Sequence, residues 1–234
     1  MYGSWVILLI LALSSIPVII VYIWFRLAKY KFSPVWFLLS LLTGAAAFFP
    51  ALVLQDFLNF PIASSARLQL FYHVFIRIAF TEELSRLLML FIFILISRRI
   101  AQKSGFSSDG IISMYAVSKG AATGLVAGLG FAILESAVYT DTGVLLLRAV
   151  TAAPLHAACG SRVGMAAVMF RTNPVQSFMR LFTATVIHGI YNIMIVIPGV
   201  PSIAAVLIAF SALISSVVAI RNGWGSEENP QISA

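Results

Sequence analysis

The sequence predicts an all-α fold, a bundle of about seven transmembrane helices formed by one domain over residues 1–221. Of the 234 residues, 61% are hydrophobic and only 10% are charged, and the mean hydropathy is +1.01. A water-soluble domain of this length could not cover its surface with so little charge. The apolar runs are each long enough to cross about 30 Å of hydrocarbon, which takes about 20 residues. Backbone in lipid must satisfy its own hydrogen bonds, so every run is expected to be helical.

The expected spans are joined by short polar connections. The first span lacks a basic segment before it and a small-residue cleavage site after it, so we expect a retained span and not a removed signal peptide. The last segment, 222–234, is polar with Gly and Pro and is expected to be a disordered cytoplasmic tail. The spans cover approximately residues 5–25, 35–55, 68–97, 112–139, 143–170, 175–197 and 200–220.

The basic residues give a topology signal. A net charge of +7 would suggest nucleic acid in a soluble protein, but here most Lys and Arg lie at the ends of apolar runs, so no nucleic-acid partner is expected. One set of span ends carries a single basic residue, Arg67, and the opposite set carries eight. We therefore expect a multi-pass protein of the plasma membrane with its N-terminus outside and its C-terminus cytoplasmic. The eight are Arg26, Lys29, Lys31, Arg98, Arg99, Lys103, Arg171 and Arg221.

Two adjacent carboxylates, Glu82 and Glu83, lie deep in the third span, where charge is costly unless it is paired or neutralised. Arg86 lies within reach of either carboxylate on the helix surface. An ion pair that only holds helices together needs one Glu, so the second indicates function. We expect one of the two to be a general base and the other to pair with Arg86. His73 and Arg77 lie about half a helical turn away and are left outside the site.

The fourth span carries a third carboxylate on an ordered face. Phe131, Glu135 and Tyr139 recur every four residues and so line one side of a helix. We expect Glu135 in the site, with Phe131 and Tyr139 as substrate or structural support. Small residues recur at the same interval upstream, a pattern that lets another helix approach closely; these are Gly120, Gly124 and Gly128.

Two histidines occupy the next two spans at a similar depth. His156 is followed by Gly160 and Gly164 at four-residue intervals, which directs the imidazole toward the bundle interior, and His188 precedes Asn192 by one turn. Each alone is typical of a hydrogen-bonded core residue, but with three carboxylates on two further spans they indicate one water-accessible cavity. Peptide hydrolysis needs a carboxylate that takes the proton of water and a His or a metal that stabilises the oxyanion. The residues singled out here include both kinds of group.

The sequence leaves the cofactor open between none and a divalent metal such as zinc. A zinc site would use His156, His188 and Glu135 and leave another Glu as the base. A metal-free site would have a Glu activate water directly while the histidines hold the oxyanion. No H-E-x-x-H helix presents the ligands, which slightly favours the metal-free form or a readily lost metal. The one cysteine, Cys159, excludes a disulfide within the chain and a cysteine-based zinc site.

These residues resemble the motifs of the PrsW family of intramembrane proteases and, more distantly, of the CaaX-processing and bacteriocin-processing membrane proteases. Arg86 stands where PrsW proteins usually have Lys, and Asn192 stands where Asp is usual, although an amide can still orient His188. The resemblance implies cleavage of membrane-anchored proteins, with anti-sigma factors as the example. It rests on four motifs in order over about residues 70–195: Glu82-Glu83-Leu84-Ser85-Arg86, Phe131 to Tyr139, His156 through Gly160 and Gly164, and His188 to Asn192.

Two other functions compete with proteolysis. A proton-coupled transporter or channel also places Glu, His and Arg inside the membrane, but it predicts internal repeats, and no motif is duplicated between the two halves. A catalytically inactive membrane binding protein is the second alternative. An assay with purified protein and a membrane-anchored peptide distinguishes it from a protease, because only the protease cleaves the peptide. For a protease in the expected orientation, the site residues lie in the middle to outer half of the bilayer, so we expect a pocket that opens outward and a cut near the extracytoplasmic side.

Overall fold

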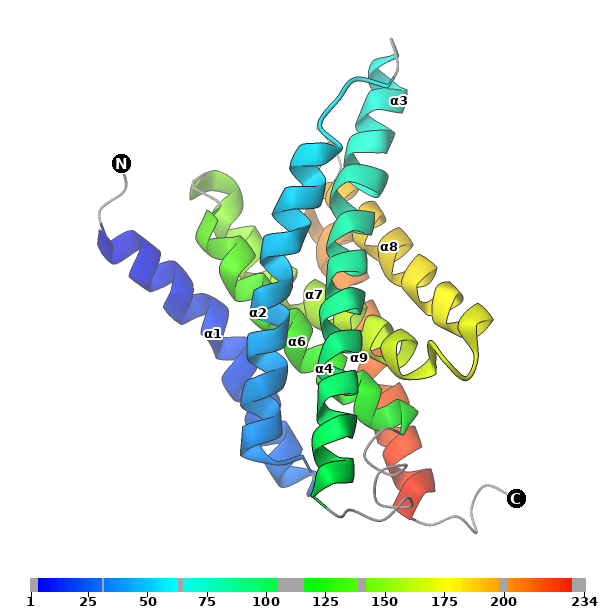
Figure 1. The fold of residues 1–234 in the computed structure, drawn as a ribbon. Helices are drawn as coiled ribbons and strands as arrows, with labels where there is room; N and C mark the ends of the chain where they lie inside the picture. The colour runs from blue at the N-terminus through cyan, green and yellow to red at the C-terminus, as the bar shows by residue number, and fades with distance from the viewer. Residues whose placement is uncertain are drawn as a thin grey trace.

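The computed structural model describes residues 4–30, 32–62, 65–104, 116–138, 142–197 and 202–228, and all regular structure in these ranges is helical. Seven helical rods cross the bundle in the described part of the chain (Figure 1). The third rod is continuous and consists of three elements, of which the middle one is a π-helix. The elements are α1 (Ser4–Leu27), α2 (Pro34–Phe57), α3 (Ala66–Phe71), η1 (Tyr72–Phe80), α4 (Thr81–Lys103), α6 (Val117–Val138), α7 (Thr142–Met169), α8 (Pro174–Val196) and α9 (Ser202–Glu228).

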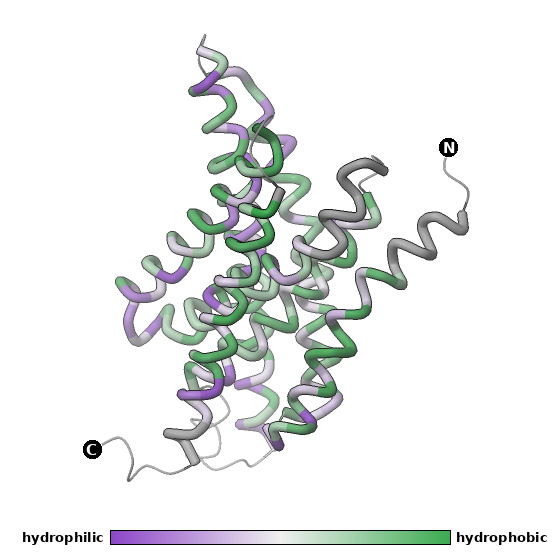
Figure 2. Tube along the Cα trace, turned by 180° about the vertical axis from the view of Figure 1, so that it is seen from behind, coloured by the Kyte–Doolittle hydropathy of each residue, from purple (hydrophilic) through white to green (hydrophobic). Residues whose placement is uncertain are grey.

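The predicted all-α membrane bundle is confirmed. Four helices, α2, α6, α8 and the 203–224 part of α9, are long and apolar enough to cross a membrane, with mean hydropathies from 1.4 to 2.6. Hydrophobic residues follow the helices along most of their length, while hydrophilic residues gather toward helix ends and connections (Figure 2). One boundary differs from expectation, because α9 continues through residues 222–228, where a disordered tail was expected, and Trp224 within that stretch is buried.

Local signals fix where two of the helices begin. The Ser33 hydroxyl accepts a hydrogen bond from the Trp36 backbone N–H at 3.1 Å at the start of α2. The Asn173 side chain accepts one from the Gln176 N–H at 3.1 Å at the start of α8. A proline follows each cap, where the missing N–H would have had no helical partner. These caps set the register of α2 and α8, both of which contribute side chains to the site.

Helices α6 and α7 pack with their backbones in close contact. A side chain added to Gly124 would collide with the backbone carbonyl of Gly160, and one added to Gly128 would collide with the carbonyl of His156. The four-residue spacing of glycines predicted this close approach of a second helix. Helix α6 is also the most enclosed apolar span, with 78% of its apolar window buried. The contact between α6 and α7 therefore fixes the relative positions of the side chains on these two helices.

Basic residues gather at one end of the helical bundle. The connection from α1 to α2, the end of α4 and the end of α9 lie at one end of the bundle, while α1 begins at the opposite end (Figure 1). Arg26 lies in the last turn of α1 and Lys103 in the last turn of α4. The basic residues that flank these helix ends therefore share one face of the molecule.

Candidate active site

Four helices bring together the six charged or imidazole side chains that the sequence singled out. Helix α4 contributes three of them, and α6, α7 and α8 contribute one each. Each is at most 5% exposed, so all six lie inside the protein and away from lipid. They are Glu82, Glu83, Arg86, Glu135, His156 and His188.

The two adjacent carboxylates have different partners. Glu83 accepts a hydrogen bond from the Arg86 guanidinium, and the same oxygen, Oε1, lies 2.8 Å from Nδ1 of His188. Glu82 accepts through Oε1 from the side-chain amide of Gln55 at 3.0 Å. Its other oxygen, Oε2, lies 3.7 Å from Nε2 of His188 and has no hydrogen-bond partner among the described residues. Oε2 of Glu83 also has no hydrogen-bond partner among the described residues, so the two carboxylates differ in that Glu83 is ion-paired with Arg86 and Glu82 is not.

Arg86 ties the carboxylates to the rest of the bundle. Its side chain is fully buried, and Nη1 donates to the backbone carbonyl of His156 at 3.2 Å. The guanidinium carbon lies 4.7 Å from the centre of the Phe131 ring, which in turn packs 5.3 Å from the His156 ring. A planar guanidinium makes these contacts in several directions at once, which a lysine ammonium does not do as well. Phe131 thus supports both Arg86 and His156, in line with the supporting role expected for it.

The two imidazoles face each other across the site. Their ring centres are 5.0 Å apart at an interplanar angle of 90°. His156 places Nε2 2.6 Å from Oε2 of Glu135, and its other nitrogen, Nδ1, has no partner in the part of the chain that the structure describes. Each imidazole therefore has one nitrogen on a carboxylate, Glu135 or Glu83, and the second nitrogen of His188, Nε2, lies 3.7 Å from Oε2 of Glu82. A carboxylate behind a histidine is the arrangement that orients histidine ligands in metal enzymes.

A family model described as PrsW family intramembrane metalloprotease matches residues 33–220, which includes all of these residues. The chain belongs to this family. It is accordingly a membrane protease, as the motifs predicted. No curated protein and no solved structure matches the chain.

The metal named in the PrsW family description fits the donors that the structure presents. Glu82, His156 and His188 each offer one ligand atom, and these atoms lie within 4.8 Å of one another. When Glu83 and Glu135 are ionised, the imidazole N–H groups must point toward them, which leaves a lone pair on the opposite nitrogens. Two histidines and one carboxylate form a ligand set known from zinc peptidases. Glu82 takes the place expected for Glu135 in this set, because Glu135 lies behind His156.

Of two further expected site residues, one makes no hydrogen bond to this cluster among the described residues, and the other lies outside them. Asn192 is half-buried on α8, and among the described residues no hydrogen bond joins it to His188. The orienting contact on Nδ1 of His188 comes from Glu83 on a different helix. Tyr139 lies outside the described residues.

Sequence reasoning missed a polar connection that leads from Glu82 toward the α2–α3 end of the bundle. Arg77 donates through Nε to the backbone carbonyl of Gln55 at 2.8 Å, and its Nη1 lies 3.1 Å from Nδ1 of His73. The α-helical projection that excluded His73 and Arg77 does not apply to η1, because a π-helix has wider turns. Gln55 was the available signal, since it is a polar residue near the end of an otherwise apolar span.

Proposed function

We propose that this PrsW-family protease hydrolyses a peptide bond of membrane-anchored protein substrates of the anti-sigma-factor type, near the extracytoplasmic side of the plasma membrane. The observation that carries the proposal is the convergence of Glu82 with His156 and His188 in a buried cluster. Buried polar atoms normally have partners, so the unpaired Oε2 of Glu82 and Nδ1 of His156 indicate groups kept for a ligand.

In the proposed reaction Glu82 acts on water. Its carboxylate takes a proton as the water oxygen bonds to the substrate carbonyl carbon, and the carbonyl oxygen becomes an oxyanion. The proton then passes to the leaving amine as the C–N bond breaks. Without a metal, His156 and His188 would stabilise the developing negative charge only through N–H groups that face the site. Glu83 and Arg86 do not touch the reacting atoms; they hold His188 and the His156 backbone in place.

In a metal-bound form Glu82, His156 and His188 would hold the divalent ion, so Glu82 would be a ligand and not the free base of the metal-free form. Such an ion supplies Lewis-acid polarisation of a carbonyl and makes water more acidic. The carboxylates behind both imidazoles support this form over the metal-free one, because they leave lone pairs and not N–H groups facing the site. Elemental analysis of the protein purified without chelators tests this. About one zinc per active chain, lowered in His156→Ala and His188→Ala, is expected, while full activity in metal-free protein would contradict it.

The carboxylate pair provides the decisive test of catalysis. Glu82→Gln should lower cleavage of a single-span peptide in proteoliposomes by 10²-fold to 10⁴-fold, about the contribution of a general base, with little change in folding. Glu83→Gln should instead reduce stability, because it leaves the Arg86 charge buried without its partner, a loss of about 3–5 kcal/mol. Asp56→Asn, at an exposed carboxylate, is the control. Full activity in both glutamate variants would refute the assignment.

We infer the orientation from the charged helix ends. Placing the ends of α1, α4 and α9 in the cytoplasm puts the N-terminus outside and the C-terminus inside. After Cys159→Ala, single cysteines introduced as Ser104→Cys and Asn59→Cys, both at exposed positions, report the two faces. An impermeant thiol reagent added to intact cells should label position 59 only. Labelling of position 104 from outside, or a cut on the cytoplasmic flank of the substrate, would reverse the proposal.

A further inference from the structure

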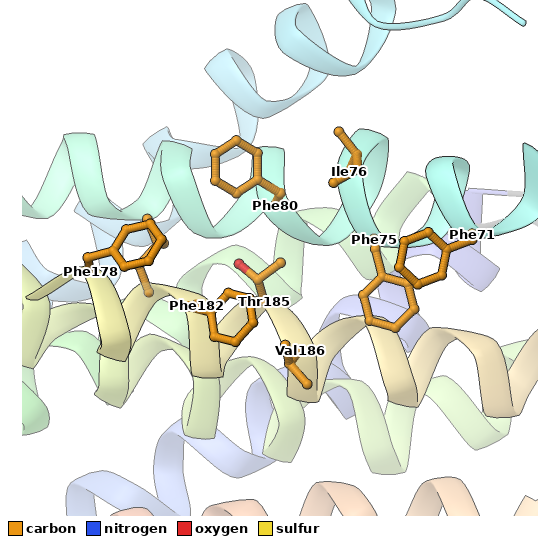
Figure 3. A pocket seen from close by; sticks show the side chains of 9 residues that line it. Phe71, Phe75, Ile76, Phe80, Phe178, Phe182, Thr185 and Val186 are labelled. Carbon is orange, nitrogen blue, oxygen red and sulfur yellow. The ribbon is translucent and has the colours of Figure 1, made fainter. Parts of the chain in front are cut away.

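An apolar groove with a volume of about 400 Å³ lies between η1 and α8, the η1–α8 groove. Figure 3 shows aromatic rings from both helices facing the space between them. Two of its rings, Phe178 and Phe182 on α8, are 62% and 52% exposed, so this side of the bundle faces the hydrocarbon of the bilayer. The groove is lined by Phe71, Phe75, Ile76, Phe80, Phe178, Leu181, Phe182, Thr185 and Val186.

The η1–α8 groove borders the active site through both of its walls. Phe80 ends η1 two residues before Glu82, and Thr185 lies three residues before His188, about one helical turn. Glu82 and His188 are themselves 3.7 Å apart across the two helices. The groove therefore lies beside the helix segments that carry Glu82 and His188, the two groups that a docked chain must reach.

Thr185 gives the groove a polar contact that the fold does not use. Its side chain is 8% exposed, and its hydroxyl has no hydrogen-bond partner among the described residues. Thr183, two residues earlier and exposed, instead donates to the backbone carbonyl of Met179 at 2.7 Å, the usual solution for a threonine in an apolar helix. In Figure 3 the Thr185 hydroxyl lies on the side of α8 that faces η1. A buried hydroxyl left without a partner in the groove indicates a ligand that supplies an acceptor.

The η1 wall of the groove consists of movable side chains. Phe71 and Phe75 stack with ring centres 4.6 Å apart, and the edge of the Phe75 ring fills the space in front of Gly189 on α8. Side chains turn more readily than backbones separate, and a π-helical segment often marks a functional site. This wall can therefore widen without disturbing the α6–α7 contact behind the active site.

We propose that the η1–α8 groove is the lateral docking site for an apolar, membrane-embedded segment of the protein substrate. This inference rests on the proposed protease function. Aromatic and aliphatic side chains of the groove take up the apolar side chains of the segment. The Thr185 hydroxyl donates to a backbone carbonyl where the segment is unwound, because a carbonyl inside an intact helix is already occupied by the helix's own hydrogen bond. The unwound stretch then continues toward Glu82 and His188.

A second apolar groove in the bundle provides a matched control. It has a volume of about 360 Å³ and lies among α1, α6, α7 and α9. Its described lining is entirely apolar, with no hydroxyl to receive an unwound backbone: Leu13, Ile16, Pro17, Ile20, Val21, Leu129, Pro154, Ala157, Phe210 and Leu213. A lipid acyl chain would suit either groove, whereas a substrate segment with a free carbonyl suits the η1–α8 groove only.

Photo-crosslinking separates the two grooves. Benzoylphenylalanine replaces Phe182 in one variant of the full chain and Phe210 in the other, in phosphatidylcholine and phosphatidylglycerol vesicles. The probe is a fluorescent peptide with one Leu/Ala span of about 20 residues followed by a Gly/Ser stretch. We expect peptide adducts from position 182 at least about ten times more often than from position 210. Equal peptide labelling, or acyl-chain adducts alone at position 182, would overturn the proposal and make the groove a lipid site.

Replacing threonine by valine, which has the same shape but no hydroxyl, tests the role of the Thr185 hydroxyl. Thr185→Val should raise the KM for cleavage of the same peptide about threefold to tenfold with little change in kcat, the range expected for one hydrogen bond. Its thermal stability should not fall, because the change removes an unpaired buried hydroxyl. Thr183→Val is the control and should leave the KM unchanged. Equal KM values for the two variants would contradict the role of Thr185.

The same experiments separate this proposal from the proposed function. Peptide that crosslinks at position 182 but is never cut by the wild-type chain supports docking and counts against the protease assignment. Val186→Trp fills the groove, whereas Leu213→Trp fills the control groove. Cleavage that continues at the wild-type rate in Val186→Trp upholds the protease and overturns docking. Loss of cleavage in Val186→Trp, with Leu213→Trp unaffected, supports both.

Discussion

The two sides of the active site are built from different kinds of contact. On the α6–α7 side, glycines bring two backbones together and leave no room for added side chains. On the η1–α8 side, the contact is made by phenylalanine rings around a groove, next to a π-helical stretch. The first side holds Glu135 against His156, and the second carries His188 and faces lipid.

This difference separates the task of holding the site from the task of admitting a substrate. Backbone contact cannot relax by rotamer changes, so Glu135 and His156 keep their relative position. Contact through aromatic rings can rearrange at lower cost, so the η1–α8 side is the one that can open. The candidate catalytic groups lie between the two, with Glu82 and Glu83 on the helix that continues η1.

The largest expected effect comes from breaking the rigid side. Gly128→Val places a side chain against the His156 carbonyl, which also accepts the hydrogen bond of Arg86. We expect a loss of about 3 kcal/mol of stability together with loss of activity. At Gly189→Ala the nearest atoms belong to the Phe75 ring, a side chain that can turn aside, so the cost should be smaller, about 1 kcal/mol. Denaturation in detergent measures both; equal losses would remove the distinction between the two sides.

The next effect concerns the carboxylate held by the rigid side. Glu135→Leu removes the partner of Nε2 of His156 and frees its imidazole to turn. Activity, and zinc affinity if the metal is present, should fall about 10-fold to 100-fold, the usual cost of losing a carboxylate behind a histidine. Glu135→Gln should retain more of both, because an amide oxygen still accepts. Unchanged activity in Glu135→Leu would show that the contact does not position His156 for the reaction.

A smaller effect is expected from the polar connection on the η1 side. Gln55→Leu removes the hydrogen bond to Oε1 of Glu82 but leaves the Arg77 contact, which uses the Gln55 backbone. A hydrogen bond to a charged group contributes about 1.5 kcal/mol at the low end, so kcat should fall about tenfold, with KM less affected. Gln69→Leu, whose side chain caps the Ile62 N–H away from the site, is the control. A KM change alone would place Gln55 in substrate binding.

The smallest effect tests the contact between α7 and α8 outside the site. The hydroxyls of Thr151 and Tyr191 lie 2.5 Å apart and are both buried. Tyr191→Phe should cost about 1 kcal/mol of stability and leave kcat nearly unchanged, because one neutral hydrogen bond is lost. A large loss of activity with normal stability would mean that this bond controls the position of α8 and of His188.

The sequence determined the class of fold and the membership of the site. Whether a segment lies in lipid depends on how well each of its residues is solvated there, and this can be read from the sequence. Apolar runs and the basic residues at their ends therefore predicted the bundle and its helices. Residues such as Glu82, His156 and His188 stood out because lipid penalises charged or polar side chains wherever they occur along a span. The PrsW-family motifs followed from the same residues.

Only the tertiary structure shows which of these groups contact one another. Glu82 and Glu83 are adjacent, so no sequence spacing distinguishes them; the difference arises because Glu83 meets His188 and Arg86, while Glu82 meets Gln55 from α2. In the same way Glu135, and not Glu82, was expected among the metal ligands until α6 was seen to pack behind His156. The π-helix and the unpaired Thr185 hydroxyl also depend on neighbouring helices. Roles in this site are set by partners far apart in the chain, and a linear sequence read one helix at a time does not contain those pairings.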